Sequence, residues 1–202
     1  MMRSERGASI VEAALLAPVF LTVLLAIFEF GLLLRNDLAL GNATVAGARA
    51  GSVAADSADA DYLVLRAIEH GIDAWGVDDL DFVVVFRASG PSATVPAACL
   101  VGPVEDVCNY YRPVDFALPY KQANGSLTAF WRCGVVAVDT FWCPGDRPAS
   151  LTWDEPVASG FNDGPAYLGV YIQGEHQFAT GLFGSSLTID ETRILTLEPR
   201  RR

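Results

Sequence analysis

The sequence has few basic residues, few histidines and none of the common catalytic motifs. Lys and Arg number 14 against 24 Asp and Glu, which gives a formal net charge of −10 over 202 residues. Such a chain is a poor ligand for nucleic acid or an anionic lipid surface, because both are negatively charged. The only histidines, His70 and His176, have no nucleophile motif such as G-x-S-x-G nearby. We therefore expect no enzymatic activity, no nucleic-acid partner and no cofactor, and we expect both histidines on the surface.

Charge is nearly absent from Ala8 to Leu34, where Glu12 and Glu29 are the only ionisable residues. A helix of this length would measure roughly 40 Å, more than the roughly 30 Å hydrocarbon core of a bilayer. The pattern predicts a short leader at residues 1–7 and a single membrane span at about residues 10–34.

The charges that flank this span predict its orientation. Arg3 and Arg6 precede it, and basic residues mark the cytoplasmic side of a span. The residues after position 34 hold 21 acids and 12 bases, a net charge near −9. We expect a single-pass protein of the cytoplasmic membrane, with its N-terminus inside and this acidic part outside.

The cysteines agree with an exported C-terminal part. No C-x-x-C is present, which argues against zinc, and we expect no metal site. An even number of cysteines in an exported region predicts disulfides. Three pairings are possible, and we favour the two pairs of cysteines that are close in sequence, Cys99–Cys108 and Cys133–Cys143.

The remaining patterns predict an α+β fold in which a small antiparallel sheet packs on helices. The first helix is expected to continue to residue 54, and a second follows within residues 56–76, capped by Asp59 or Asp61. Runs of β-branched and aromatic residues predict strands at residues 80–88, 135–139, 165–178 and 186–199, the last with a bulge or an edge at residues 190–192. Residues 55–202 would form the extracytoplasmic domain. A disulfide-bearing loop insertion, rich in proline and glycine, is expected at about residues 89–150.

The N-terminal segment "ERGASIVEAALLAPVFLTVLLAIFEFG" resembles the TadE-like family, the minor pilins or pseudopilins of tight-adherence (Flp-type) pilus systems. Its Gly-x4-Glu motif is Gly7 to Glu12, and its helix-end motif is Glu29-Phe30-Gly31. The C-terminal "FATGLFGSSLTIDETRILTLEP" is similar to the end of these proteins, a Gly-Leu-Phe-Gly turn followed by a final strand.

The resemblance implies a role and a set of partners. A prepilin peptidase would cut between Gly7 and Ala8, and Glu12 would then pair with the new N-terminal ammonium of a neighbouring subunit during pilus assembly. Other pilins, assembly subunits and membrane lipid are the further partners, and the destination is the membrane or an extracellular pilus.

Other interpretations remain open from the residues alone. Glu12 could instead reach the membrane interface of an ordinary anchor. Glu29 could pair with a cation of a neighbouring subunit or with Arg35, or it could lie solvated at the outer headgroups. Six aromatic residues in or near the loop region would form either core or a binding face: Tyr110, Tyr111, Trp131, Phe141, Trp142 and Trp153. The alternative function is therefore an anchored extracytoplasmic binding or adhesion protein with an uncleaved N-terminus.

Overall fold

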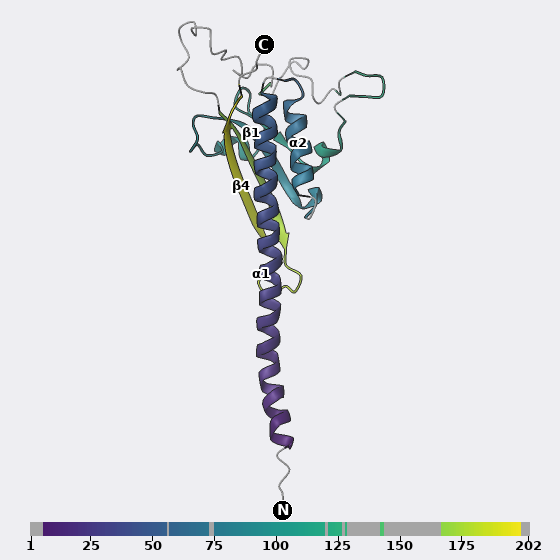
Figure 1. The fold of residues 1–202 in the computed structure, drawn as a ribbon, viewed down its shortest axis with the longest axis vertical. Coiled ribbons are helices and arrows are strands. Elements are labelled where there is room, and N and C mark those ends of the chain that lie inside the picture. Colours follow the sequence, from purple (N-terminus) through teal and green to yellow (C-terminus); the bar gives the residue numbers. More distant parts are fainter. Residues whose placement is uncertain are drawn as a thin grey trace, which may run out of the picture.

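The protein consists of one long helix and a small α+β head built around the C-terminal half of that helix (Figure 1). A computed structural model describes residues 6–55, 57–72, 75–119, 121–126, 128, 142–143 and 167–198. The predicted α+β class, with a long N-terminal helix and a small antiparallel sheet, is confirmed.

The first helix, α1 (Arg6–Ala54), has 49 residues and continues through Pro18. Its N-terminal half carries no other element and projects away from the head (Figure 1). Among the described residues it is the one helix long and apolar enough to cross a membrane, and its most apolar window is not buried by the rest of the chain. The hydroxyl of Thr22, which lies within this apolar stretch, donates a hydrogen bond of 2.8 Å to the carbonyl of Pro18. This helix fits a single-pass membrane anchor.

The head contains a four-stranded antiparallel sheet in the order β2-β1-β3-β4. Its strands are β1 (Leu80–Ala88), β2 (Cys108–Tyr111), β3 (Tyr167–Gln177) and β4 (Ser186–Thr196). The long strands β3 and β4 pair without interruption from Tyr167 and Thr196 to Gln177 and Ser186. Of the two alternatives expected at residues 190–192, the edge is therefore confirmed and the bulge is wrong, because β4 lies at the edge of the sheet and pairs without a register shift.

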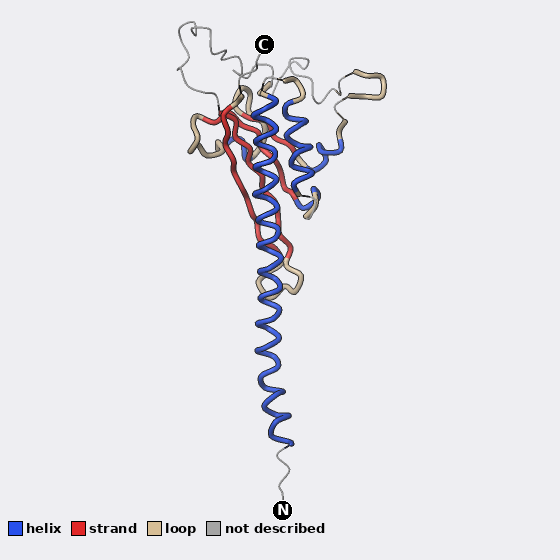
Figure 2. The backbone as a smooth tube through the Cα atoms, in the orientation of Figure 1, coloured by secondary structure: helices blue, strands red, loops and turns tan. Residues whose placement is uncertain are grey.

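The helices α1 and α2 (Ala60–Gly71) lie on one face of the sheet (Figure 2). The side chains of β1 alternate, so that Val83 and Val85 face the helices while Val84 and Phe86 face the opposite side. The loop after β1 covers that opposite side and includes Cys99. The sheet thus has an apolar cluster on each face.

The second helix, α2 (Ala60–Gly71), packs directly against α1. Small residues allow this close approach. A Cβ added to Gly71 would lie 2.6 Å from the Cα of Ala43, and one added to Gly47 would lie 2.7 Å from the Cγ1 of Ile68. Gly47 therefore lies at a helix–helix contact, where a larger side chain would not fit without a shift.

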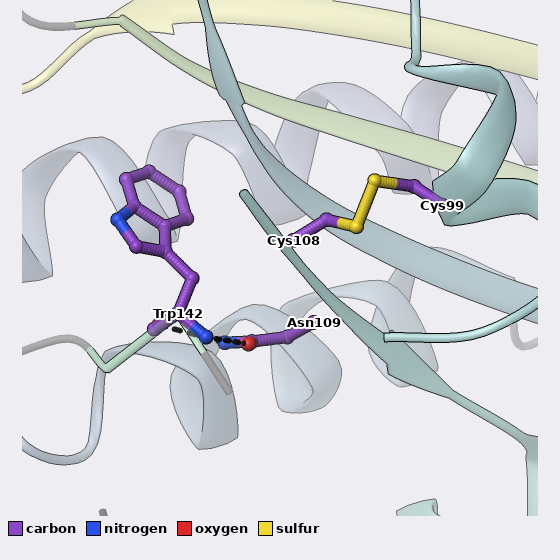
Figure 3. Close-up of a disulfide and its surroundings, with 4 residues drawn as sticks. All are labelled: Cys99, Cys108, Asn109 and Trp142. Carbon is purple, nitrogen blue, oxygen red and sulfur yellow. Dashed lines mark hydrogen bonds between the residues drawn. A yellow bond between two sulfur atoms is a disulfide. The ribbon is translucent and has the colours of Figure 1, made fainter. Parts of the chain in front are cut away.

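A disulfide joins Cys99 and Cys108, with 6.1 Å between their Cα atoms (Figure 3). This is the first of the two predicted pairs. Cys143 is also disulfide-bonded, while Cys133 and the strand predicted at residues 135–139 lie outside the described residues. The bond ties the loop after β1 to β2, a short strand that the sequence patterns missed inside the expected insertion.

Candidate functional site

The β3–β4 turn, residues 178–185, meets α1 at Glu29. The side chain of Glu29 is fully buried, and its carboxylate accepts hydrogen bonds from the backbone N–H groups of Ala179, at 3.1 Å, and Thr180. A carboxylate that accepts backbone N–H groups makes charge-assisted bonds, which are stronger than neutral ones. Glu29 therefore attaches the turn to the long helix.

The turn has the backbone conformation that its glycines allow. Gly181 and Gly184 have positive φ angles of 69° and 113°, in the region that favours glycine. Inside the turn, the N–H of Phe178 donates to the carbonyl of Ser185 at 3.0 Å, and that of Gly184 to Gly181 at 3.4 Å. The Gly-Leu-Phe-Gly sequence thus forms a compact loop that closes β3 onto β4.

Aromatic rings surround this attachment. The ring of Phe30, next to Glu29 on the helix, lies 5.2 Å from that of Phe183, and Phe183 lies 6.2 Å from Phe178. Three apolar side chains here stay substantially exposed: Phe30 at 50%, Leu182 at 51% and Phe183 at 45%. The site therefore combines a buried polar attachment with an exposed apolar surface.

A second polar contact joins the same face of the helix to β3. Asn36 lies two helical turns after Glu29, and its side-chain amide nitrogen is 2.9 Å from Nδ1 of His176. An amide NH2 group can only donate, so this ring nitrogen accepts. His176 is 2% exposed and lies within β3. The expectation of a surface histidine was wrong for His176, whereas His70 is exposed.

These contacts change the interpretation of Glu29. The expectation of a solvated side chain was wrong, because Glu29 is buried under the turn and accepts hydrogen bonds from two backbone N–H groups. A periodic signal was present in the sequence. Glu29, Asn36 and Leu40 follow the spacing i, i+7, i+11, which places them on one helix face, and all three contact the head.

The residues predicted for processing and assembly lie far from this site. Gly7 and Ala8 are in the first turn of α1, and Glu12 is exposed on the bare part of the helix. Glu12 lies 17 residues before Glu29, a rise of about 26 Å along the axis. The structure therefore does not bring the two carboxylates together, and the roles of Gly7, Ala8 and Glu12 stay predictions.

A second buried polar cluster connects α2 to β2. The carboxylate of Asp61 accepts hydrogen bonds from the side chains of Asn109, at 2.5 Å, and Tyr111, at 2.7 Å. Asn109 also bonds both backbone groups of Trp142, the N–H at 2.5 Å and the carbonyl at 3.0 Å (Figure 3). The cluster thus ties α2, β2 and the segment around Trp142 together.

The expectation that Asp61 could cap α2 was wrong. Asp61 is 2% exposed and lies inside α2. The residue before α2 is Asp59, whose side chain makes no capping hydrogen bond and instead accepts from the Ser57 hydroxyl at 2.5 Å. The i, i+2 spacing of Asn109 and Tyr111 would have placed them on one face of a strand, had β2 been recognised.

Some aromatic residues of the loop region pack in the head, and the others lie outside the described residues. Tyr111 and Trp142 are buried, and Tyr110 stacks on Phe82 at 4.8 Å. Trp131, Phe141 and Trp153 lie outside the described residues. Within the described ranges, no three His, Cys, Asp or Glu side chains form a cluster that could hold a metal ion.

Comparison with known proteins finds a family that is similar to the N-terminal helix. Residues 7–49 match the family described as TadE-like protein. No curated protein and no solved structure matches the chain. The matched segment includes Gly7, Glu12 and the Glu29-Phe30-Gly31 motif, and it ends where α1 is already buried in the head. The similarity to TadE-like proteins therefore covers the long N-terminal helix.

Proposed function

We propose that this protein is a non-enzymatic TadE-like minor pilin or pseudopilin that takes part in assembly of a tight-adherence (Flp-type) pilus. The observation that carries the proposal is the family match over residues 7–49, on a helix whose N-terminal half is apolar and exposed. An apolar helix that its own chain leaves uncovered needs lipid or the helices of other subunits around it.

Glu12 would provide the assembly contact. No described residue of the same chain forms a hydrogen bond or an ion pair with its exposed side chain. An unpaired carboxylate beside the hydrocarbon core is unfavourable, which favours a partner of opposite charge. If a prepilin peptidase cuts after Gly7, the ammonium of Ala8 on a neighbouring subunit would neutralise Glu12 and set the axial register between two helices.

The same helix would transmit that register to the head. The buried face of α1 runs from Glu29 into the helix–helix and helix–sheet contacts. The head would therefore move with the helix as one body when subunits assemble outside the membrane, with the N-terminus on the cytoplasmic side.

The test is the N-terminal sequence of the protein isolated from membranes of cells that contain the prepilin peptidase, determined by mass spectrometry. We expect a mature chain that begins at Ala8 in the wild type and an unprocessed chain in Gly7→Ala. Gly31→Ala is the matched control, because Gly31 is on the same helix and a Cβ there meets nothing within 4 Å. It should be processed normally.

A wild-type chain that still begins at Met1 or Met2 would remove the ammonium partner of Glu12 and overturn this mechanism. The protein would then be an anchored extracytoplasmic binding or adhesion protein with an uncleaved N-terminus. A second measurement, copurification of pilus subunits with the wild type and with Glu12→Ala, tests the assembly step separately. The variant should lose them.

A further inference from the structure

We propose that the β3–β4 turn contacts the membrane. It inserts Leu182 and Phe183 among the lipids at the outer surface of the bilayer that α1 spans, at the point where α1 leaves that bilayer. The partner is the lipid itself. This inference requires that α1 spans a bilayer, and it does not require that the protein joins a pilus.

The spacing of Glu12 and Glu29 along α1 indicates how deep the helix lies in the bilayer. Residues 13–28 lie between the two carboxylates, contain no charge, and measure about 24 Å as a helix. With the turns at either end, this length matches a hydrocarbon core of roughly 30 Å. Glu29 then lies at the outer boundary and Glu12 at the inner one, so neither carboxylate is at the centre of the bilayer.

The head reaches down to that same boundary. The turn is the lowest part of the head beside α1, and below it the helix is bare (Figure 1). Its contacts with Glu29 and Phe30 fix its height on the helix. A span that continued to residue 34, as the sequence suggested, would pull the turn into the hydrocarbon core. We therefore place the outer end of the span near residue 28.

The turn has the composition that an interface requires. Its eight residues, Phe178 to Ser185, contain no charged side chain, although the part of the chain after residue 34 has a net charge near −9. The side chains of Leu182 and Phe183 are about half exposed, beside an equally exposed Phe30. Aromatic and aliphatic side chains gain free energy when they enter the boundary between headgroups and acyl chains.

The backbone of the turn is also suited to a partly apolar environment. Irregular backbone tolerates such an environment only where its polar groups are paired within the protein. The N–H groups of Ala179 and Thr180 bind Glu29, and that of Phe178 binds Ser185. The buried carboxylate thus has a clear role, because it satisfies two backbone donors of the turn.

The test measures the depth of an added tryptophan in the full-length protein, reconstituted in phosphatidylcholine vesicles. Phe183→Trp and Leu182→Trp place an indole on the turn. Val101→Trp is the control, because Val101 is 87% exposed in the loop that follows β1, and β1 ends beside Tyr167 at the opposite end of β3. The wild-type protein is measured in the same way, and its emission, which comes from the four native tryptophans, is subtracted from that of each variant.

We expect lipid brominated near the top of its acyl chains to reduce the added emission of either turn variant at least about twofold, whereas aqueous iodide has little effect. The Val101→Trp control should show the reverse. The proposal is overturned if the turn indoles respond like the control, which would place the turn in water. It is also overturned if they resist both quenchers, which would mean that protein, such as a second copy of the chain, covers the turn.

Discussion

The carboxylate of Glu29 accepts a hydrogen bond from the backbone N–H of Thr180, a residue 151 positions later in the chain. This contact joins the end of the apolar helix, which lies within the match to the TadE-like family, to the turn before the final strand. The two motifs are thus one structural unit, in which the helix supplies the acceptor and the turn supplies the donors.

The first prediction concerns this contact. Glu29→Ala removes the acceptor of the N–H groups of Ala179 and Thr180, so these amides should exchange hydrogen at least about tenfold faster. Hydrogen exchange with mass spectrometry on peptides that cover residues 178–185 would measure the change. Glu105→Ala, at an exposed glutamate in another loop, is the control. Unchanged exchange in Glu29→Ala would show that the turn holds its shape without the helix.

The second prediction concerns the buried Asp61 cluster. Asp61→Ala would leave the Asn109 amide and the Tyr111 hydroxyl without their acceptor, and should lower the free energy of unfolding by about 2–4 kcal/mol. Urea unfolding of the solubilised full-length chain measures this value. Asp61→Asn keeps one acceptor oxygen and should cost less. Asp78→Ala, at an exposed aspartate, should stay within about 0.5 kcal/mol of the wild type.

The third prediction compares two glycines in helices. Gly71→Ala would place a Cβ 2.6 Å from the Cα of Ala43, a backbone atom that cannot move aside alone, and should destabilise the head by about 1–3 kcal/mol. Gly41→Ala meets nothing within 4 Å and should stabilise α1 by up to about 1 kcal/mol. The same urea experiment measures both. Equal effects would argue against the close packing of α1 and α2.

The fourth prediction concerns the Cys99–Cys108 disulfide. Replacing both cysteines by alanine removes a crosslink over nine positions, which should lower the free energy of unfolding by about 2–3 kcal/mol. The loop over the apolar face that contains Phe86 should also become more sensitive to protease. Unfolding under oxidising conditions isolates this bond, because Cys143 then keeps its own disulfide. A double variant as stable as the wild type would show that packing alone holds the loop.

The fifth prediction concerns alkaline pH. Burial, followed by the negative charges of Asp190 and Asp81, raises the pKa of Tyr171 above its ordinary value of about 10. A group whose pKa is raised by folding contributes its full stability below the unfolded pKa and loses it as the pH rises through the folded pKa. Stability should therefore fall above pH 10, and Tyr171→Phe should fall less steeply. Similar slopes for both proteins would contradict this assignment.

The sequence patterns that predicted secondary structure most reliably were long and uniform. The run of β-branched and aromatic residues at 80–88 coincides with β1, because such residues fit a half-buried strand in almost any context. The four residues of β2 lie between prolines and glycines, and only pairing with β1 and the disulfide makes them a strand. Short strands depend on their partners, which the local sequence does not contain.

The sequence by itself determined the long apolar helix, its two carboxylates and the α+β class, because charge, length and periodicity are local properties. Only the tertiary structure decided what two of the acids do. Asp61 and Glu29 look like surface charges in the sequence, and both become buried acceptors for donors that arrive from strands and turns far along the chain. A buried carboxylate is stable only where donors meet it, and the fold brings those donors.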